Sequence, residues 1–168
     1  MLHWRIADTE QLKEEGVRFM CRHSEDLGLP YKWSTVMNFL YTSLYDSGFM
    51  MALDGQQQVR GILAYSYGKG SGQDGDKNRL EIHFLYLEDG FRKGKNLVKA
   101  MGALLEREAE LPQPIREIEF HSPPTEAHTK LFDKIAMIRE SKTYPSALLH
   151  IYVTTPDRIQ QYVARVLA

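Results

Sequence analysis

The sequence has few residues of the kinds that mark disulfide-bonded, zinc-binding or membrane proteins. Its 168 residues include one cysteine, Cys21, which excludes an intramolecular disulfide and a cysteine-based zinc cluster. No apolar run approaches the roughly 18 residues of a membrane span, and the N-terminal segment lacks the apolar core of a signal peptide. The formal net charge is −1, which gives no reason to expect a nucleic-acid partner. We therefore expect a soluble cytoplasmic protein that binds neither membranes nor nucleic acid.

Several familiar catalytic motifs are also missing. Gly70 and Gly75 have the spacing of a Walker A loop, but Asp76 stands where a lysine must reach the phosphate. An EF-hand pattern that starts at Asp74 lacks its central glycine and its final glutamate. HExxH and GxSxG do not occur, which excludes the zinc-protease and nucleophile-elbow patterns. Cys21 lies beside an apolar helical stripe, so we expect a small buried side chain there rather than a nucleophile.

The periodicity of the apolar residues predicts one α/β domain over residues 1–168. Hydrophobic residues make up 43% and charged residues 26%, as in ordinary globular domains. Alternation, helical spacing and turn residues predict strands at 3–7, 49–53, 57–68, 79–88, 115–122, 138–145 and 147–155, and helices at 8–28, 34–48, 97–111, 125–137 and 156–168. The polar, glycine-rich stretch 68–78 is expected to be a mobile hairpin loop. The order βααβββαβαββα predicts a mixed central sheet flanked by helices.

The basic stretch "GFRKGKNLVKA", residues 90–100, follows the strand expected to be the most central in the sheet. The first amides of a helix have no internal acceptors and carry the positive end of its dipole. A glycine at that point lets the backbone approach a bound anion. Arg92, Lys93, Lys95 and Lys99 add cations around it. The pattern indicates an anion site, although a solvated basic helix start has the same composition, and both interpretations stay open.

The segment "LEIHFLYLEDGFRKGKNLVKAMGALLE" resembles the central motif of the GNAT acetyltransferase superfamily, which is a strand, an [RQ]xxGx[GA] loop and a helix. The segment "IREIEFHSPPTEAHTKLFDKIAM" is similar to the strand and helix that follow in that family, and the order of the elements also matches. The resemblance implies a GNAT-like fold over nearly the whole chain. It also implies acetyl-CoA as the co-substrate, with its pyrophosphate on the loop amides.

The chain departs from the motif in two places. If Gly94 is the main glycine, Phe91 occupies the Arg/Gln position and Asn96 the final Gly/Ala position; alternatively, Arg92 is the motif arginine and the loop is one residue shorter. Phe132 stands where many family members have a tyrosine that protonates the departing thiolate. For acetyl-CoA the resemblance implies contacts with Leu85, Tyr86, Leu87, Arg92, Lys93, Gly94, Lys95, Asn96, Leu97, His128 and Phe132. No metal site is expected.

Acetyl transfer to an amine requires removal of a proton, stabilisation of an oxyanion and departure of a thiolate. Glu81 lies about where some GNAT enzymes carry a general-base glutamate, and His83, two residues on, is expected on the same face of the strand. The alternatives are a surface ion pair for Glu81 and a hydrogen-bonded core histidine for His83. His121 ends a strand that borders the acceptor in this fold, or is an exposed loop histidine. For His128, a hydrogen-bonded pocket histidine is the first interpretation and a substitute acid the second.

The predicted function is acylation of a primary amine by acetyl-CoA or another acyl-CoA, through direct attack in a ternary complex. The acceptor is expected to be a small-molecule or peptide amine. In this fold the region around Tyr31 and Trp33 often forms a wall of the acceptor site, whereas Tyr41 and Tyr45 are expected to pack in the core. The alternative function is a catalytically inactive GNAT-like module that binds CoA or a protein. Edge strands in the C-terminal pair are consistent with a homodimer.

Overall fold

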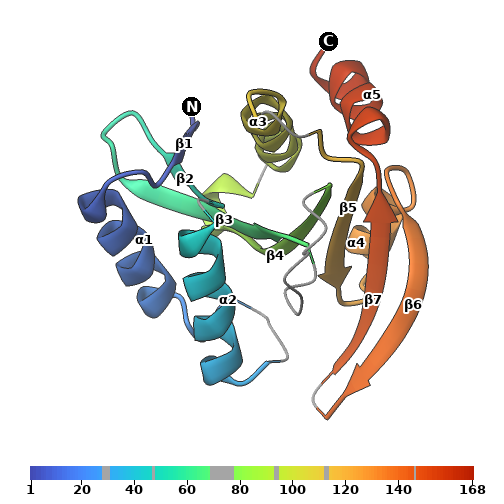
Figure 1. Ribbon diagram of the computed structural model, residues 1–168, viewed down its shortest axis with the longest axis horizontal. Coiled ribbons are helices and arrows are strands. Elements are labelled where there is room, and N and C mark those ends of the chain that lie inside the picture. The colour runs from blue at the N-terminus through green and yellow to red at the C-terminus, as the bar shows by residue number, and fades with distance from the viewer. Residues whose placement is uncertain (28–30, 47, 69–77, 93–94, 112–113, 146) are drawn as a thin grey trace. The chain divides into compact units, whose positions relative to one another are not determined.

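The order of helices and strands predicted from the sequence is confirmed in the computed structural model of the chain (Figure 1). The structure describes residues 1–27, 31–46, 48–68, 78–92, 95–111, 114–145 and 147–168, without the side chains of Ala127 and His128. The strands are β1 (His3–Ile6), β2 (Phe49–Leu53), β3 (Val59–Tyr67), β4 (Arg79–Leu87), β5 (Glu117–Ser122), β6 (Met137–Tyr144) and β7 (Ala147–Thr154). The helices are α1 (Glu10–Arg22), α2 (Trp33–Tyr45), α3 (Asn96–Ala109), α4 (Glu126–Phe132) and α5 (Pro156–Leu167), and a 3₁₀ turn spans Asp89–Phe91.

The seven strands form a mixed sheet in the order β1-β2-β3-β4-β5-β7-β6. The pairs β1–β2, β2–β3, β5–β7 and β6–β7 are antiparallel, and β4–β5 is parallel. Parallel strands need a crossover connection, and α3 lies in the one between β4 and β5. The expected α/β class with a mixed sheet is confirmed. Within the part of the chain that the structure describes, no helix is long and apolar enough to span a bilayer.

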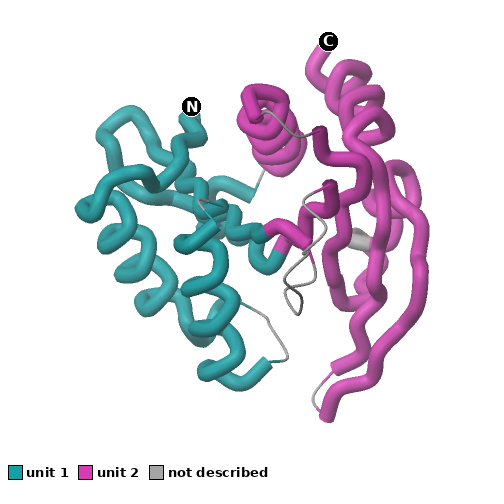
Figure 2. Tube along the Cα trace, viewed as in Figure 1, with its two compact units in different colours: residues 1–66, 83–96 teal, residues 67–82, 97–168 magenta. Residues whose placement is uncertain are grey.

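The chain divides into two compact units, drawn teal and magenta in Figure 2. Unit 1 comprises Met1–Ser66 and His83–Asn96, and unit 2 comprises Tyr67–Ile82 and Leu97–Ala168. Strand β4 contributes to both, because its first four residues belong to unit 2 and the rest to unit 1. The predicted loop at 68–78 lies outside the described residues, except for its two end residues.

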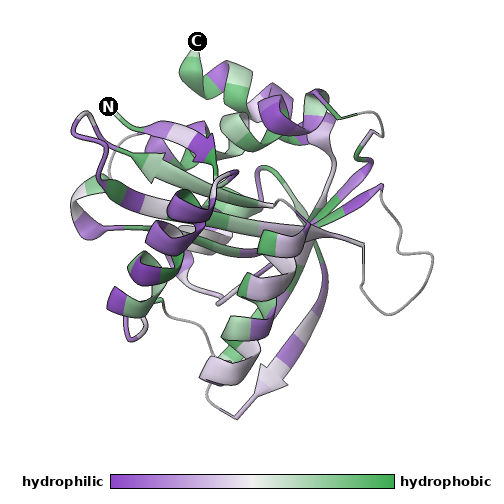
Figure 3. Ribbon diagram, turned by 60° about the vertical axis from the view of Figure 1, so that its left-hand side comes forward, coloured by the Kyte–Doolittle hydropathy of each residue, from purple (hydrophilic) through white to green (hydrophobic). Residues whose placement is uncertain are grey.

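The core of unit 1 is built from β2, β3, the end of β4 and the apolar stripes of α1 and α2. Thr9 caps α1 by accepting a hydrogen bond from the Leu12 amide at 3.1 Å. The stripe of α1 buries Gly16, Phe19 and Met20, and α2 buries Val36, Leu40 and Ser43. Figure 3 shows hydrophilic and hydrophobic residues on the same helices, as amphipathic helices require.

The core of unit 2 contains an aromatic cluster contributed by β5, α4 and β7. Phe120 lies 4.8 Å from Phe132 and 5.2 Å from Tyr152, between ring centroids. Helix α5 is capped by Thr155 and carries proline at its first position, as predicted from the sequence. The contacts of the Phe132 ring with Phe120 and Tyr152 hold α4 against β5 and β7.

Three expectations about burial are wrong. Cys21 is exposed because it lies about 100° around α1 from Met20, outside the buried stripe. Tyr41 and Tyr45 are 71% and 79% exposed, and their rings stack on one another at a centroid distance of 6.4 Å. On α2 the buried stripe runs through Val36 and Leu40, and both tyrosines fall beside it. The predicted helix at 125–137 is also shorter, because α4 ends at Phe132 and β6 begins at Met137.

Candidate active site

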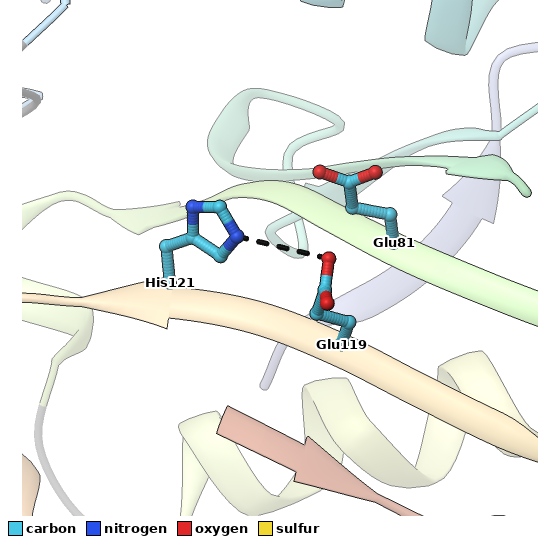
Figure 4. A group of neighbouring side chains, drawn as sticks. All are labelled: Glu81, Glu119 and His121. Carbon is cyan, nitrogen blue, oxygen red and sulfur yellow. Dashed lines mark ion pairs between the residues drawn. The ribbon is translucent and has the colours of Figure 1, made fainter. Parts of the chain in front are cut away.

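Three side chains that can accept or donate a proton meet in unit 2, on neighbouring strands. Alternation along β5 buries Ile118 and Phe120 on one face and places Glu119 and His121 together on the other. The parallel register sets Glu81 of β4 opposite Glu119. Figure 4 shows the side chains of Glu81, Glu119 and His121 close together on these two neighbouring strands. The carboxylate oxygens and the imidazole nitrogen that could bind a metal ion lie within 4.8 Å of one another.

Glu119 is the most buried member of this cluster, with 3% of its side chain exposed. One carboxylate oxygen, Oε1, accepts from Arg79 at 3.3 Å and from Arg139 at 3.2 Å. The other, Oε2, lies 3.7 Å from His121 Nε2. Both arginines also pair with Glu117, which lies on the same strand. A buried carboxylate without such partners is strongly destabilising, so the two guanidinium groups offset the cost of burying Glu119 beside His121.

The cluster has the chemistry of a proton-handling group. Among the described residues, Glu81, Glu119 and His121 are also the set whose donor atoms lie close enough to share one metal ion. Two arginines already contact Glu119, and their charge opposes a further cation at that carboxylate. A carboxylate that is held in its charged form orients a neighbouring imidazole and favours its protonated form. The arrangement therefore fits proton transfer better than metal binding.

His83 has different partners from Glu81, although the two are only two residues apart on β4. Its Nε2 atom lies 2.7 Å from the hydroxyl of Ser66, a buried residue of β3. Its ring stacks on Phe39 of α2, with a centroid distance of 4.5 Å and an interplanar angle of 8°. These contacts fit the alternative considered for His83 in the sequence analysis, a packed and hydrogen-bonded core histidine. Glu81 forms its cluster with Glu119 and His121 instead.

The end of β4 and the turn that follows form the part of unit 1 where the GNAT resemblance implies cofactor contacts. Leu85 is half-buried, and Tyr86 and Leu87 are buried. Arg92 turns back onto the strand: its Nε donates to the Leu87 carbonyl at 2.7 Å, and it pairs with Asp89 at 2.8 Å. The guanidinium of Arg92 therefore holds the turn to the strand.

The start of α3 is tied to the same turn. Asn96 is the first residue of the helix, and its side-chain amide donates to the Phe91 carbonyl at 2.8 Å. Among the described non-glycine residues, Gln57 alone has a positive φ, so Asn96 does not adopt an unusual backbone angle. Lys95 is exposed and Leu97 is half-buried. Of the other predicted contacts, Lys93 and Gly94 lie outside the described residues, as does the side chain of His128.

Phe132 lies in the core of unit 2. It is 9% exposed, and its ring contacts Phe120 and Tyr152. Burial raises the pKa of the Tyr152 phenol, which stays protonated at neutral pH. The position that resembles the family's tyrosine is thus filled by an apolar ring.

Sequence reasoning missed two residues that organise these regions. Glu119 was not considered, because a charged residue in an alternating strand is usually solvent-facing. Its partners Arg79 and Arg139 are 40 and 20 residues away, so no local spacing reveals them. His23 is likewise not among the predicted residues, because its partners Tyr86 and Glu88 follow 63 and 65 residues later. The alternation of Glu117, Glu119 and His121 in "EIEFH" was the available signal for the cluster.

Comparison with known proteins places this architecture among the GNAT acetyltransferases. No family model and no curated protein sequence matches the chain. Solved structures do: Ard1 from Thermoplasma volcanium matches with a TM-score of 0.67 and 13% identity, over 92% of this chain and 97% of that one. NAA60 of Arabidopsis thaliana, in complex with acetyl-CoA, matches with a TM-score of 0.65 and 11% identity, over 92% and 99%.

A third similar structure is the ribosomal-protein-S5-alanine acetyltransferase of Vibrio fischeri. It matches with a TM-score of 0.66 and 10% identity, over 93% of each chain. All three match over nearly the whole of this chain, as does an acetyltransferase of the GNAT family from Staphylococcus aureus. The fold of this chain is the GNAT N-acetyltransferase fold.

Proposed function

We propose that the chain is an N-acetyltransferase that transfers an acetyl group from acetyl-CoA to a primary amine. The observation that carries the proposal is the cluster of Glu81, Glu119 and His121 on a GNAT sheet. A carboxylate beside an imidazole supplies the proton acceptor that an attacking ammonium group requires. The fold supplies the second support, because similar structures include one with acetyl-CoA bound and one with a peptide and CoA bound.

In the proposed reaction Glu81 removes a proton from the acceptor ammonium, directly or through one water molecule. The amine nitrogen then attacks the thioester carbonyl, so that a C–N bond forms and the C–S bond breaks. The nitrogen loses its second proton and the thiolate of CoA, as it leaves, takes up one proton, so that the products are a neutral amide and free CoA. Glu119 does not touch the reacting atoms in this scheme. It positions His121, whose Nε2 lies 3.7 Å from the Glu119 carboxylate, close to Glu81.

Acetyl-CoA fits the residues at the end of β4 and the start of α3. The first amides of α3 have no acceptor within the helix, and Lys95 stands exposed immediately before it. Arg92 and Asn96 hold the intervening turn by hydrogen bonds to the carbonyls of Leu87 and Phe91. A bound pyrophosphate would therefore meet backbone donors and one free-standing ammonium group.

The first test is binding, followed by turnover. Acetyl-CoA is titrated into the protein by calorimetry, and thermal unfolding is measured with and without CoA. A ligand present at 100-fold its Kd stabilises the folded state by about 2.7 kcal/mol. A panel of peptide N-termini and small amines is then screened for release of free CoA thiol.

The outcomes separate the proposal from its alternative. Binding with thiol release that depends on an amine supports the acetyltransferase. Binding without thiol release across the panel favours the catalytically inactive CoA-binding module. Absence of binding contradicts the acetyltransferase and the CoA-binding module, because each requires CoA, and leaves the protein-binding module as the alternative.

A further inference from the structure

His23 joins two chains of contacts that hold the turn after β4. It is the residue that caps the C-terminus of α1, and its ring is packed 4.5 Å from the ring of Phe19 and 5.0 Å from the ring of Tyr86. Its Nδ1 atom lies 3.1 Å from the Tyr86 hydroxyl, and its Nε2 atom lies 3.1 Å from the Glu88 carboxylate. Both ring nitrogens are therefore used, and each faces a residue at the end of β4.

The first chain of contacts runs from His23 through Tyr86 to Arg92. The Tyr86 ring is 9% exposed, and the Arg92 guanidinium lies 5.0 Å from its centroid. From that position Arg92 donates to the Leu87 carbonyl and pairs with Asp89 in the 3₁₀ turn. The hydroxyl of Tyr86 fixes the ring against His23, so the surface on which Arg92 rests is itself held in place.

The second chain runs from His23 through Glu88 to Arg60. The Glu88 carboxylate accepts from His23 with one oxygen and from Arg60 with the other, each at 3.1 Å. The Glu88 amide donates to the Arg60 carbonyl at 2.9 Å, and the Arg60 guanidinium lies 5.3 Å from the Phe91 ring. The Nε atom of Arg60 also donates to the Oδ2 atom of Asp54 at 2.8 Å, which fixes the position of the guanidinium group. Phe91, which occupies the Arg/Gln position in one of the two alignments with the GNAT motif, thus lies beside a cation from β3.

From this convergence we propose that His23 is a positioning residue for acetyl-CoA, because it sets the conformation of residues 88–92 through Tyr86 and Glu88. The inference rests on the proposed function, since it names a further residue on which cofactor binding depends. His23 does not contact the cofactor or the reacting atoms in this scheme. Residues 88–92 lead into the start of α3, whose first amides are the proposed donors to the pyrophosphate, and Asn96 of α3 donates to the Phe91 carbonyl of this turn. The two chains of contacts therefore hold in place the turn to which those donors are tied.

One tautomer of the His23 ring satisfies both contacts at once. A hydrogen on Nε2 donates to the Glu88 carboxylate, and the bare Nδ1 accepts from the Tyr86 hydroxyl. Burial raises the pKa of Tyr86, so its phenol remains a donor at neutral pH. A phenylalanine at position 23 keeps the ring contacts with Phe19 and Tyr86 but removes both hydrogen bonds, which makes it a sharper probe than alanine.

The test uses the full chain and three variants. His23→Phe breaks both chains of contacts at once. Tyr86→Phe removes only the hydroxyl group and so breaks only the first chain of contacts, the one that runs from His23 through Tyr86 to Arg92. His150→Phe is the matched control, because His150 bonds to Ser141 in unit 2 at 2.8 Å and touches neither chain. For each protein we would measure amide hydrogen exchange of residues 88–92, the Kd of CoA by calorimetry, and the KM for acetyl-CoA separately from kcat.

We expect His23→Phe to accelerate exchange in residues 88–92, and to raise the Kd of CoA and the KM for acetyl-CoA by about tenfold. Two hydrogen bonds worth about 1 kcal/mol each are lost, and relaxation of the turn recovers part of that free energy. The remaining loss of about 1.4 kcal/mol corresponds to a tenfold change in Kd. The effect on kcat should be less than about threefold, because chemistry is not touched. Tyr86→Phe should give a smaller change in the same direction, and His150→Phe none.

Unchanged exchange in His23→Phe would overturn the inference, as would faster exchange with an unaltered Kd, which would make the contacts purely structural. Failure of the wild-type protein to bind CoA is a separate result. It would remove the proposed function and the positioning role together, while the exchange data would still report whether His23 orders the turn. If His23→Phe fails to fold, Tyr86→Phe carries the test alone, with the same two contradicting outcomes.

Discussion

His121 Nε2 lies 3.7 Å from a carboxylate oxygen of Glu119, whose side chain is 3% exposed. The other oxygen of that carboxylate accepts hydrogen bonds from two arginines. Glu119 therefore links a structural ion-pair network to the one histidine of the proposed catalytic cluster. A change at this residue should be visible in stability and in the pH dependence of the reaction.

Glu119→Gln should lower the free energy of unfolding by about 2 kcal/mol. The substitution removes the charge that balances Arg79 and Arg139, and both guanidinium groups keep enough exposure to recover part of the loss in water. Urea unfolding measures the change. Glu140→Gln is the control, because Glu140 is exposed and pairs with Lys142 at only 4.0 Å. Equal stability of the two variants would contradict the role assigned to the buried carboxylate.

Glu81→Gln should reduce kcat at neutral pH by about 100-fold, because the amide cannot accept a proton from the ammonium group. The affinity for CoA should stay nearly the same, since Glu81 is not among the expected cofactor contacts. Steady-state kinetics and calorimetry give the two numbers. Glu106→Gln, an exposed residue of α3, should leave both unchanged. Full turnover in the Glu81 variant would mean that the acceptor arrives deprotonated or that another group removes the proton.

Gly61→Ala should destabilise unit 1 by about 1–3 kcal/mol, as overpacked core substitutions do. A Cβ atom at this position of β3 would lie 2.5 Å from Leu87 Cδ2 and 2.8 Å from the Tyr86 carbonyl oxygen. The carbonyl belongs to the backbone and cannot rotate away. At Gly55, in the β2–β3 turn, a Cβ atom meets nothing within 4 Å, so Gly55→Ala should change stability by less than about 0.5 kcal/mol. Thermal unfolding of both variants compares them directly, and equal loss at the two positions would refute the packing argument.

Asp54 should make stability depend on pH in the acid range. Hydrogen bonds from the Gln58 amide and from the Arg60 side chain lower the pKa of this carboxyl below its ordinary value. The folded state therefore binds the proton less readily than the unfolded chain does. The resulting stability is fully present above the unfolded pKa of about 3.9 and is lost as the pH falls through the lower folded pKa. Wild type and Asp54→Asn should differ in urea midpoint at pH 7 and converge toward pH 2, whereas a constant difference would contradict the shift.

The order of elements could be predicted because each strand and helix carries its own period. The strand at 49–53 was located to the residue, and Asp54 and Gly55 marked the turn after it. The end of α1 was placed six residues too late, at 28 rather than 22, because the residues after Arg22 keep helical composition. The chain leaves the helix at His23, whose amide shares the last carbonyls and whose side chain turns to Tyr86. That contact is long-range, and no local pattern contains it.

Glu81 and His121 were predicted as candidate site residues, but Glu119 and the grouping of the three were not. Strand parity placed Glu81 and His83 on one face, and the structure gives them different neighbours. What brings Glu81 to His121 is the parallel register of β4 with β5, which depends on the crossover through α3. The predicted burial of Cys21 and Tyr41 was wrong, because each lies one residue away from the buried stripe of its helix. Such errors follow from sequence reasoning that sees a helix face only to within about 100°.

Strand β6 stands at the end of the strand order, and its residues from Met137 to Thr143 are exposed. An exposed edge that carries Met137 and Ile138 is a template on which other chains can add strands and start to aggregate. The charges of Arg139, Glu140 and Lys142 follow directly, and a growing intermolecular sheet would have to bury or stack them. Arg139, which balances the charge of Glu119, thus also opposes aggregation at this edge of the sheet. Substitutions that neutralise Glu140 and Lys142 should change the free energy of unfolding little, because both side chains are exposed, yet they should shorten the time that concentrated solutions stay clear.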